Sequence, residues 1–190
     1  MAGEEGAAGV GVGDRAGAQV DPRAASFARL TSARLAACYR LAAAILGDAV
    51  EAEDATHDAA VRAWQRWASL RDESKFDQWF GRILINECRD RLRRRKSELR
   101  RPLPVGGPGA GPADLGDSLA ERQALAEALD RLEPEHRIVI VLRFYQGLDD
   151  REIAVRTRAR PGTVKSRMHY ALRALRAARD AVARIDEVER

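Results

Sequence analysis

The stretch GLDDREIAVRTRARPGTVKSRMHYALRALRA, residues 147–177, predicts two helices joined by a short turn. Asp149 and Glu152 have the spacing of a capping box, in which each side chain accepts a backbone hydrogen bond at the start of a helix. Gly147 is suited to closing the helix before it. Pro161 favours the first position of the second helix, where its missing N–H costs nothing. The turn between the helices is therefore expected at residues 158–160.

The second helix has one apolar face and a basic remainder. Its apolar residues recur at helical spacing and predict a buried stripe: Val164, Met168, Leu172 and Leu175. Lys165 and Arg167 project elsewhere, close to the start of the helix. This is the pattern of a helix-turn-helix, whose second helix enters the major groove of DNA and presents its first residues to base edges.

Charge is concentrated in separate segments of the chain. The formal net charge is only +4, yet residues 82–101 carry +6 and residues 151–179 carry +8. Residues 48–58 carry −5 and contain no Lys or Arg. Two separate basic segments indicate a polyanion that is held at two places.

Composition predicts an all-α fold of two small helical domains, with the helix-turn-helix in the second. Aromatic residues make up 5% of the chain, and residues 102–116 are rich in proline and glycine, as in a flexible linker. The predicted divisions are a disordered tail (1–24), a first domain (25–97), a linker (98–117), a second domain (118–178) and a tail (179–190). Within the second domain, residues 138–142 are apolar on every side and should be fully buried.

Several classes of protein are disfavoured. No apolar run approaches the roughly 18 residues of a membrane span, and no signal peptide is recognisable at the N-terminus, so we expect no membrane insertion and a cytoplasmic location. Cys38 and Cys88 match no metal spacing and are predicted to be free buried thiols. We identify no catalytic residue, no metal site and no cofactor.

Three blocks of the chain together resemble the bacterial RNA polymerase sigma factors of the extracytoplasmic-function (ECF) type. They are LAAAILGDAVEAEDATHDAAVRAW (41–64), FDQWFGRILINECRDRLRRRK (76–96) and LRFYQGLDDREIAVRTRARPGTVKSRMHYALRALR (142–176). A helix-turn-helix alone is a weak signal, but three blocks in this order with a linker before the third are specific. The resemblance implies a transcription initiation factor whose first and second domains are sigma regions 2 and 4.

The resemblance implies that the acidic helix near residue 54 docks on core polymerase. The residues carried over for this contact are Asp54, Asp58, Arg62 and Trp64. Taken singly, each acidic residue is better explained as part of a solvated face near a helix N-terminus. As a block they favour docking, although relatives commonly have bulkier residues in the same segment. The resemblance also implies an inhibitory anti-sigma partner.

For the −10 promoter element, the resemblance implies a loop that holds a flipped base and a basic helix after it. The residues concerned are Arg71, Ser74, Lys75, Phe76, Asn86, Arg89, Arg93 and Arg94. The chemistry agrees, because single strands are held by a basic track together with pocketed bases. Arg89, Arg93 and Arg94 suit phosphates. Trp79 could stack on a base, but its spacing with Ile83 favours core packing.

For the −35 element, the match falls on Arg143, Thr163, Lys165, Ser166, Arg167, His169 and Tyr170. Lys165 and Arg167 have donors for guanine edges or phosphates. The sequence departs from relatives at residues 157–159, where they have a glycine between apolar residues. A non-glycine residue in a left-handed turn costs on the order of 1 kcal/mol, so a looser turn or another geometry is expected.

Two other functions remain open on sequence alone. A helix-turn-helix transcriptional regulator that acts without core polymerase would bind duplex DNA tightly by itself. A metal-dependent enzyme is less favoured. Its candidate ligands are Glu51, Glu53, Asp54, His57 and Asp58, but Glu53 points away from the helix face that the others share, and no second segment offers ligands.

Overall fold

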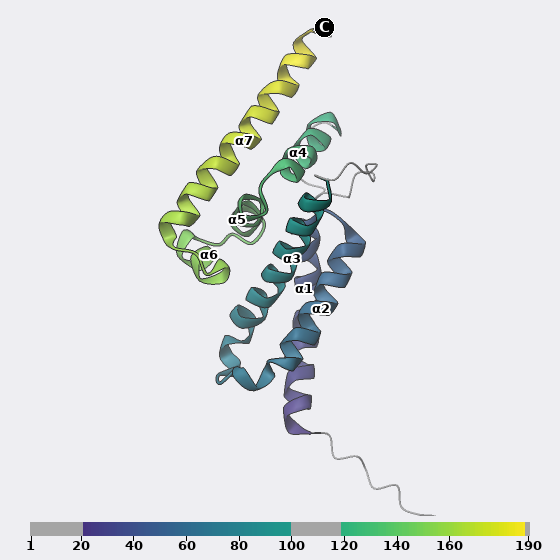
Figure 1. Ribbon diagram of the computed structural model, residues 1–190, viewed down its shortest axis with the longest axis vertical. Coiled ribbons are helices and arrows are strands. Elements are labelled where there is room, and N and C mark those ends of the chain that lie inside the picture. Colours follow the sequence, from purple (N-terminus) through teal and green to yellow (C-terminus); the bar gives the residue numbers. More distant parts are fainter. Residues whose placement is uncertain (1–20, 100–118, 189–190) are drawn as a thin grey trace, which may run out of the picture.

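The computed structural model describes residues 21–99 and 119–188, all in helices and short connections (Figure 1). In the first domain, α1 (Pro22–Leu46) and α2 (Ala49–Gln65) form a hairpin closed by α3 (Phe76–Leu99). Two 3-10 turns, η1 (Trp67–Ser69) and η2 (Glu73–Lys75), connect α2 to α3. The second domain contains α4 (Leu119–Arg131), α5 (Pro134–Phe144), α6 (Asp150–Thr157) and α7 (Pro161–Val188). The predicted all-α fold is confirmed.

Helix α1 begins at Pro22, before residue 25, where the first domain was predicted to start. The Asp21 side chain accepts a hydrogen bond from the Arg23 N–H at 2.9 Å, and Pro22 occupies the first turn. Both features favour a helix start, so the first helix extends into the predicted tail. At the other end, α7 continues through residues that were predicted to form a tail. The predicted linker lies almost entirely outside the described residues.

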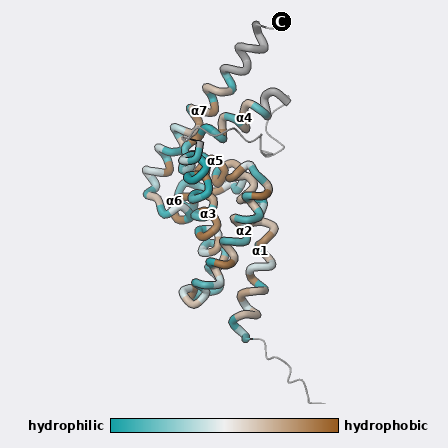
Figure 2. Tube along the Cα trace, turned by 45° about the vertical axis from the view of Figure 1, so that its right-hand side comes forward, coloured by the Kyte–Doolittle hydropathy of each residue, from teal (hydrophilic) through white to brown (hydrophobic). Residues whose placement is uncertain are grey.

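Small residues bring the helices of the first domain close together. Four alanines of α2 are fully buried at helical spacing: Ala52, Ala55, Ala59 and Ala63. They lack side chains beyond Cβ, so α2 approaches its neighbours closely, and larger residues of α1 and α3 fill the core. Figure 2 shows hydrophobic and hydrophilic segments alternating along these helices, as expected for amphipathic helices. The small side chains in this part of α2 thus face the core.

The predicted buried run and Cys88 are buried as the sequence indicates, whereas Cys38 is half-buried. Ile138, Val139 and Leu142 are each 0% exposed, and their neighbours 140 and 141 are also buried. Cys38 and Cys88 are free, and burial raises the pKa of the Cys88 thiol to about 12 and that of Cys38 to about 11. Both thiols therefore stay protonated near neutral pH, which makes them poor nucleophiles.

The two domains lie against each other. Helix α5 contacts α1 and α3, and α6 contacts α3, so the second domain covers one side of the first (Figure 1). Arg137 of α5 is only 4% exposed and its guanidinium lies against Gly47, at the end of α1. Arg156 of α6 lies in the same way against Gly81 of α3. Polar groups of the second domain therefore fill the two places where the first domain has no side chain.

Candidate nucleic-acid and polymerase interfaces

The predicted capping box is present at the start of α6. Asp149 Oδ1 accepts hydrogen bonds from the N–H groups of Arg151 and Glu152, both at 2.8 Å. The Asp149 N–H donates to Glu152 Oε2, also at 2.8 Å. The hydrogen bond from the Glu152 backbone holds the pKa of Asp149 below its usual value. Together these bonds fix the direction in which α6 leaves α5.

The turn between α6 and α7 has an ordinary left-handed geometry in spite of its sequence. Arg158 has φ 54° and ψ 35°, and it alone among the described non-glycine residues has a positive φ. The Ala159 N–H donates to the Ala154 carbonyl at 3.0 Å, and the Thr157 hydroxyl donates to the Ile153 carbonyl at 2.7 Å. The prediction of a looser turn is therefore wrong. The chain keeps the left-handed turn, and Arg158 adopts a strained conformation.

Replacing Arg158 with glycine should stabilise the protein. The left-handed conformation costs an L-residue roughly 1–2 kcal/mol, and the greater freedom of unfolded glycine offsets part of the gain, which leaves about 1 kcal/mol. The measurement is urea unfolding followed by circular dichroism. Arg160→Gly is the matched control, since it removes the same charge two residues away from a position without a positive φ, and it should lower stability. Equal effects of the two substitutions would contradict the assignment of strain to Arg158.

Most residues predicted for the −35 element come together on the first turns of α7. Lys165, Ser166 and His169 are exposed there, and Tyr170 is 56% exposed. The Tyr170 ring lies between His136 and His169, at centroid distances of 6.0 and 5.7 Å. Val164 and Met168 are buried, and Leu172 and Leu175 are half-buried against the core, so the predicted apolar stripe faces inward.

The structure does not bring Arg143 to this group. Its guanidinium donates to the Leu148 carbonyl at 2.9 Å and to Asp150 at 3.0 Å. These bonds tie α5 to the start of α6. Arg143 thus has an internal role in positioning the helix-turn-helix, whatever it does toward DNA.

The residues predicted for the −10 element divide into an exposed loop and a basic helix. Arg71, Ser74 and Lys75 are exposed in and before η2, where Asp72 accepts hydrogen bonds from the Ser74 N–H and hydroxyl. Phe76 is only 1% exposed, and its ring stacks on Phe80 at 5.3 Å. In this conformation Phe76 supports the loop from the core side and offers no face to a base.

Trp79 lies in the same aromatic cluster. Its ring centroid is 6.1 Å from that of Phe76 and 6.3 Å from that of Trp67. The side chain is half-buried and contacts the core, in agreement with the packing role that its spacing favours.

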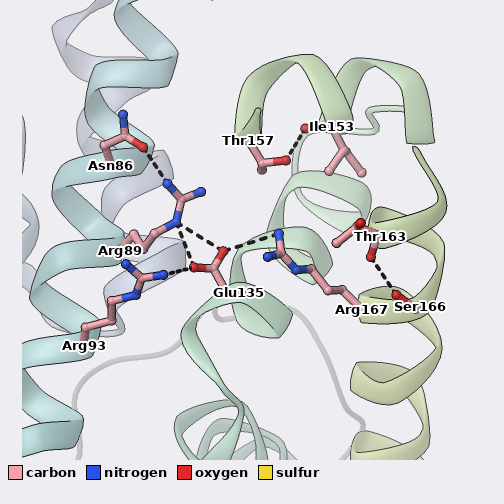
Figure 3. Close-up of polar contacts among 9 residues, drawn as sticks. All are labelled: Asn86, Arg89, Arg93, Glu135, Ile153, Thr157, Thr163, Ser166 and Arg167. Carbon is pink, nitrogen blue, oxygen red and sulfur yellow. Dashed lines mark hydrogen bonds and ion pairs between the residues drawn. The ribbon is translucent and has the colours of Figure 1, made fainter. Parts of the chain in front are cut away.

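On α3, Asn86 and Arg89 form one unit, because Asn86 Oδ1 accepts a hydrogen bond from Arg89 Nη1 at 2.5 Å. Arg89 Nε and Arg93 Nη2 then reach the same carboxylate, Glu135 of α5, at 3.2 and 2.6 Å (Figure 3). Arg167 of α7 approaches Glu135 from the other side at 3.4 Å. Residues predicted for the −10 and −35 elements thus meet at one carboxylate.

The residues predicted to bind core polymerase lie on α2. Asp54 and Asp58 pair with Arg91 at 3.9 and 2.6 Å, yet their side chains stay 64% and 48% exposed. Trp64 is 47% exposed beside Phe27. These three side chains can therefore be reached by a partner.

Arg62 of the same predicted group has an internal contact. It lies 2.7 Å from Glu87, a carboxylate on α3 whose side chain is 2% exposed. Burial raises the pKa of Glu87, and the Arg62 charge opposes this shift. Arg62 therefore compensates a buried charge, in addition to any contact with a partner.

Sequence reasoning missed Glu135 and Glu87 as residues of interest. Glu135 follows Pro134 at a helix start, where a carboxylate is favourable in any protein, so its place in the sequence gives no special signal. Glu87 lies between apolar residues of α3, and this placement is a signal that could have indicated a buried acid needing a cation. Arg158 and Arg160 were counted in the basic segment but not as site residues, although both line the cleft beside Glu135.

The ligand candidates for a metal enzyme are engaged elsewhere. Glu51 pairs with Arg95 at 3.3 Å and Asp58 pairs with Arg91. Within the described side chains, no three His, Cys, Asp or Glu residues gather closely enough to hold a metal. Across residues 21–99 and 119–188, no helix combines the length and hydropathy that a membrane crossing requires.

The fold and these surfaces define a class: a two-domain helical DNA-binding protein with a helix-turn-helix and a second basic helix. Comparison with known families gives two matches, Sigma-70 region 2 over residues 30–98 and Sigma-70 region 4 over residues 122–175. The chain belongs to the sigma-70 family, as an ECF RNA polymerase sigma factor. It therefore directs promoter-specific transcription initiation, with region 2 in the first domain and region 4 in the second.

Individual relatives agree with this family. The chain is 34% identical over 168 residues to the ECF RNA polymerase sigma factor SigL of Mycobacterium tuberculosis, with 84% of this chain and 94% of that protein covered. It is 33% identical over 167 residues to the RNA polymerase sigma-E factor of Streptomyces coelicolor, with 86% and 93% covered.

Two solved structures share the fold at 25% identity. The sigma factor RpoE of Bartonella quintana, in complex with the anti-sigma factor NepR, matches with a TM-score of 0.62 over 80% of this chain and 95% of that one. CnrH, in complex with the cytosolic domain of CnrY, matches with a TM-score of 0.57 over 85% and 91%.

Proposed function

We propose how the surfaces of this sigma factor divide the work of initiation. The exposed loop before α3, together with the arginines of α3, binds the −10 element. The start of α7 binds the −35 element in the major groove. The exposed face of α2 around Asp54, Asp58 and Trp64 docks on core polymerase, and Arg62 keeps that face folded. One observation supports this division. The two domains carry separate basic surfaces, and α2 carries an acidic and aromatic surface.

The protein is proposed to have no catalytic chemistry of its own and to act in the cytoplasm, where polymerase and promoters meet. A regulator that works without polymerase is the alternative. It is less favoured, because a regulator that works without polymerase would need neither a sigma region 2 nor an exposed α2 surface for docking.

Runoff transcription with purified core polymerase tests the proposal. Core enzyme supplemented with the protein should start transcription at specific promoters of the host genome, whereas core alone should not. Alanine at Asp54 or Asp58 should weaken co-purification with core, while alanine at Glu53, on the same helix but outside the predicted group, should not. Tight promoter binding without any association with core would support the alternative regulator instead.

An inhibitory protein partner is also proposed. The two solved structures described above are both complexes, one of a sigma factor with an anti-sigma factor and the other of CnrH with the cytosolic domain of CnrY. Affinity purification of the chain from its unstressed host should recover such a partner. Recovery of the chain alone at every yield would count against it.

A further inference from the structure

The contact between the two domains converges on a single side chain. Glu135 receives two arginines of α3, Arg89 and Arg93, and one arginine of α7, Arg167. The Glu135 side chain is 20% exposed and the Arg89 side chain is 13% exposed, so this ion pair is largely removed from water. Lys96 of α3 adds a further ion pair, with Glu133, the N-cap residue of α5. Figure 3 shows the three guanidinium groups turned toward the one carboxylate.

A carboxylate in this position offers arginine what a DNA phosphate offers. Both groups present two anionic oxygens that accept charge-assisted hydrogen bonds from guanidinium. Arg89 and Arg93 are the side chains proposed to contact phosphates of the −10 region, and they cannot bind DNA and Glu135 together. The domain contact therefore competes directly with promoter DNA.

The contact is also poised to break. A cleft of about 500 Å³ beside Glu135 is lined by five arginines, and Glu135 is the one acidic residue in its lining. The five are Arg89, Arg93, Arg158, Arg160 and Arg167. Arg158 and Arg160 have no ion-pair partner within the described residues. The surplus of positive charge opposes closure, and a polyanion such as DNA is a stronger attractor than one carboxylate.

Interfaces between domains of one chain generally allow the domains to separate unless they are large and hydrophobic. Here Arg137 is buried against the first domain, and burial lowers the pKa of its guanidinium, which reflects the cost of removing that cation from water. Opening would return this charge to solvent. Closure thus combines apolar packing, since buried residues of both domains form one cluster, with ion pairs that offset a desolvation cost, and a change in either should shift the balance.

We propose that Glu135 is an internal phosphate mimic that holds regions 2 and 4 together and reduces DNA binding by the free protein. This inference rests on the proposed DNA-binding roles of Arg89, Arg93 and Arg167. In the closed form Glu135 occupies the arginines of both regions, and engagement of promoter DNA releases it. The free sigma factor would then recognise promoters poorly until polymerase separates the two domains.

The test compares Glu135→Gln with Glu127→Gln in the full-length protein. Glu127 is the matched control, because it lies in the same domain, loses the same charge and pairs with Arg131 of its own helix. Small-angle X-ray scattering should show a larger radius of gyration for Glu135→Gln alone. In fluorescence anisotropy without polymerase, this variant should bind promoter DNA carrying both elements about tenfold more tightly, as expected if the open form is about a tenth of the population.

A second variant separates opening from a local change of charge. A Cβ at Gly81 would lie 2.9 Å from Arg156 Nη1, and its nearest neighbours are all atoms of Arg156. Gly81→Leu should therefore displace the Arg156 side chain from α3 and weaken the docking of α6 on α3 without altering any charge, and it should also expand the protein and tighten DNA binding. Its effect should not add to that of Glu135→Gln, because either change alone opens the domains.

Tighter binding by Glu135→Gln without expansion, or wild-type behaviour of Gly81→Leu, would overturn the inference. Thermal melts followed by circular dichroism check folding, and if Glu135→Gln does not fold, Gly81→Leu decides alone. The proposed DNA-binding roles fail in a different way. If they are wrong, alanine at Arg89 or Arg93 leaves open-complex formation in runoff assays unchanged, whatever the scattering shows.

Discussion

Replacing Lys165 with alanine is expected to reduce transcription from a promoter with an intact −35 element by roughly tenfold to a hundredfold. Lys165 is exposed on the first turns of α7 and has no ion pair within the described part of the chain, so its ammonium is available to DNA. A specific base contact is worth about 1–3 kcal/mol, and each 1.4 kcal/mol is a factor of ten. The measurement is runoff transcription at constant salt, with core binding assayed separately.

Arg176→Ala is the control, since it removes an exposed positive charge from the same helix but lies three turns further along, away from the groove-entering end. It should change transcription by less than twofold, and neither variant should lose affinity for core polymerase. Loss of core binding in Lys165→Ala would show that the domains have been misassigned. Arg167→Ala is less informative, because Arg167 also contacts Glu135 and its removal alters the closed form as well.

Replacing Arg62 with alanine is expected to destabilise the first domain by about 2 kcal/mol at neutral pH. Its removal leaves the Glu87 carboxylate buried without a cation, and breaking a fully buried pair typically costs 3–5 kcal/mol. The smaller figure applies because the Arg62 side chain is 47% exposed and partly screened by water. Chemical unfolding of the full-length protein measures the loss.

The loss should depend on pH in a defined direction. The pKa of Glu87 lies above its ordinary value of 4.5, so the folded protein holds the proton more tightly than the unfolded chain does. This group therefore favours folding most below pH 4.5, and that contribution is lost as the pH rises through the raised pKa. Arg62→Ala should accordingly cost little in acid and more near pH 7.

The double variant Arg62→Ala/Glu87→Gln distinguishes a structural role of Arg62 from a contact with polymerase. A neutral amide needs no cation, so this variant should recover most of the stability lost by Arg62→Ala. If core binding recovers with it, Arg62 acts by holding α2 against α3. If stability recovers and core binding does not, Arg62 contacts polymerase directly. No recovery of stability would contradict the buried-charge explanation.

Features encoded within a few residues of one another were predictable from the sequence. The capping box of α6, the buried stripe of α7 and the burial of residues 138–142 depend on spacing along one helix. The turn at Arg158 was located correctly, but its geometry was not. A looser turn was predicted because a left-handed conformation is costly for arginine. In the structure, hydrogen bonds made by Ala159 and Thr157 hold the left-handed turn in place.

The interfaces were predictable only in outline. The sequence indicated which segments are basic and which helix is acidic, but Phe76 proved buried, and Arg143 and Arg62 proved to be engaged by internal partners. Periodicity could not separate these roles. The sequence does not show whether the partner of a positive side chain is a DNA phosphate or a carboxylate of the same chain.

What the sequence by itself determined was the family, the helices and the two domains, because these depend on local spacing and on motifs that lie close together. Only the tertiary structure decided that Glu135 meets Arg93, from which it is 42 residues distant in the chain, and that Arg167 reaches the same carboxylate. The physical reason is that domain docking sums many weak contacts, polar and apolar, between surfaces that are far apart in the chain. No short segment of sequence contains that sum.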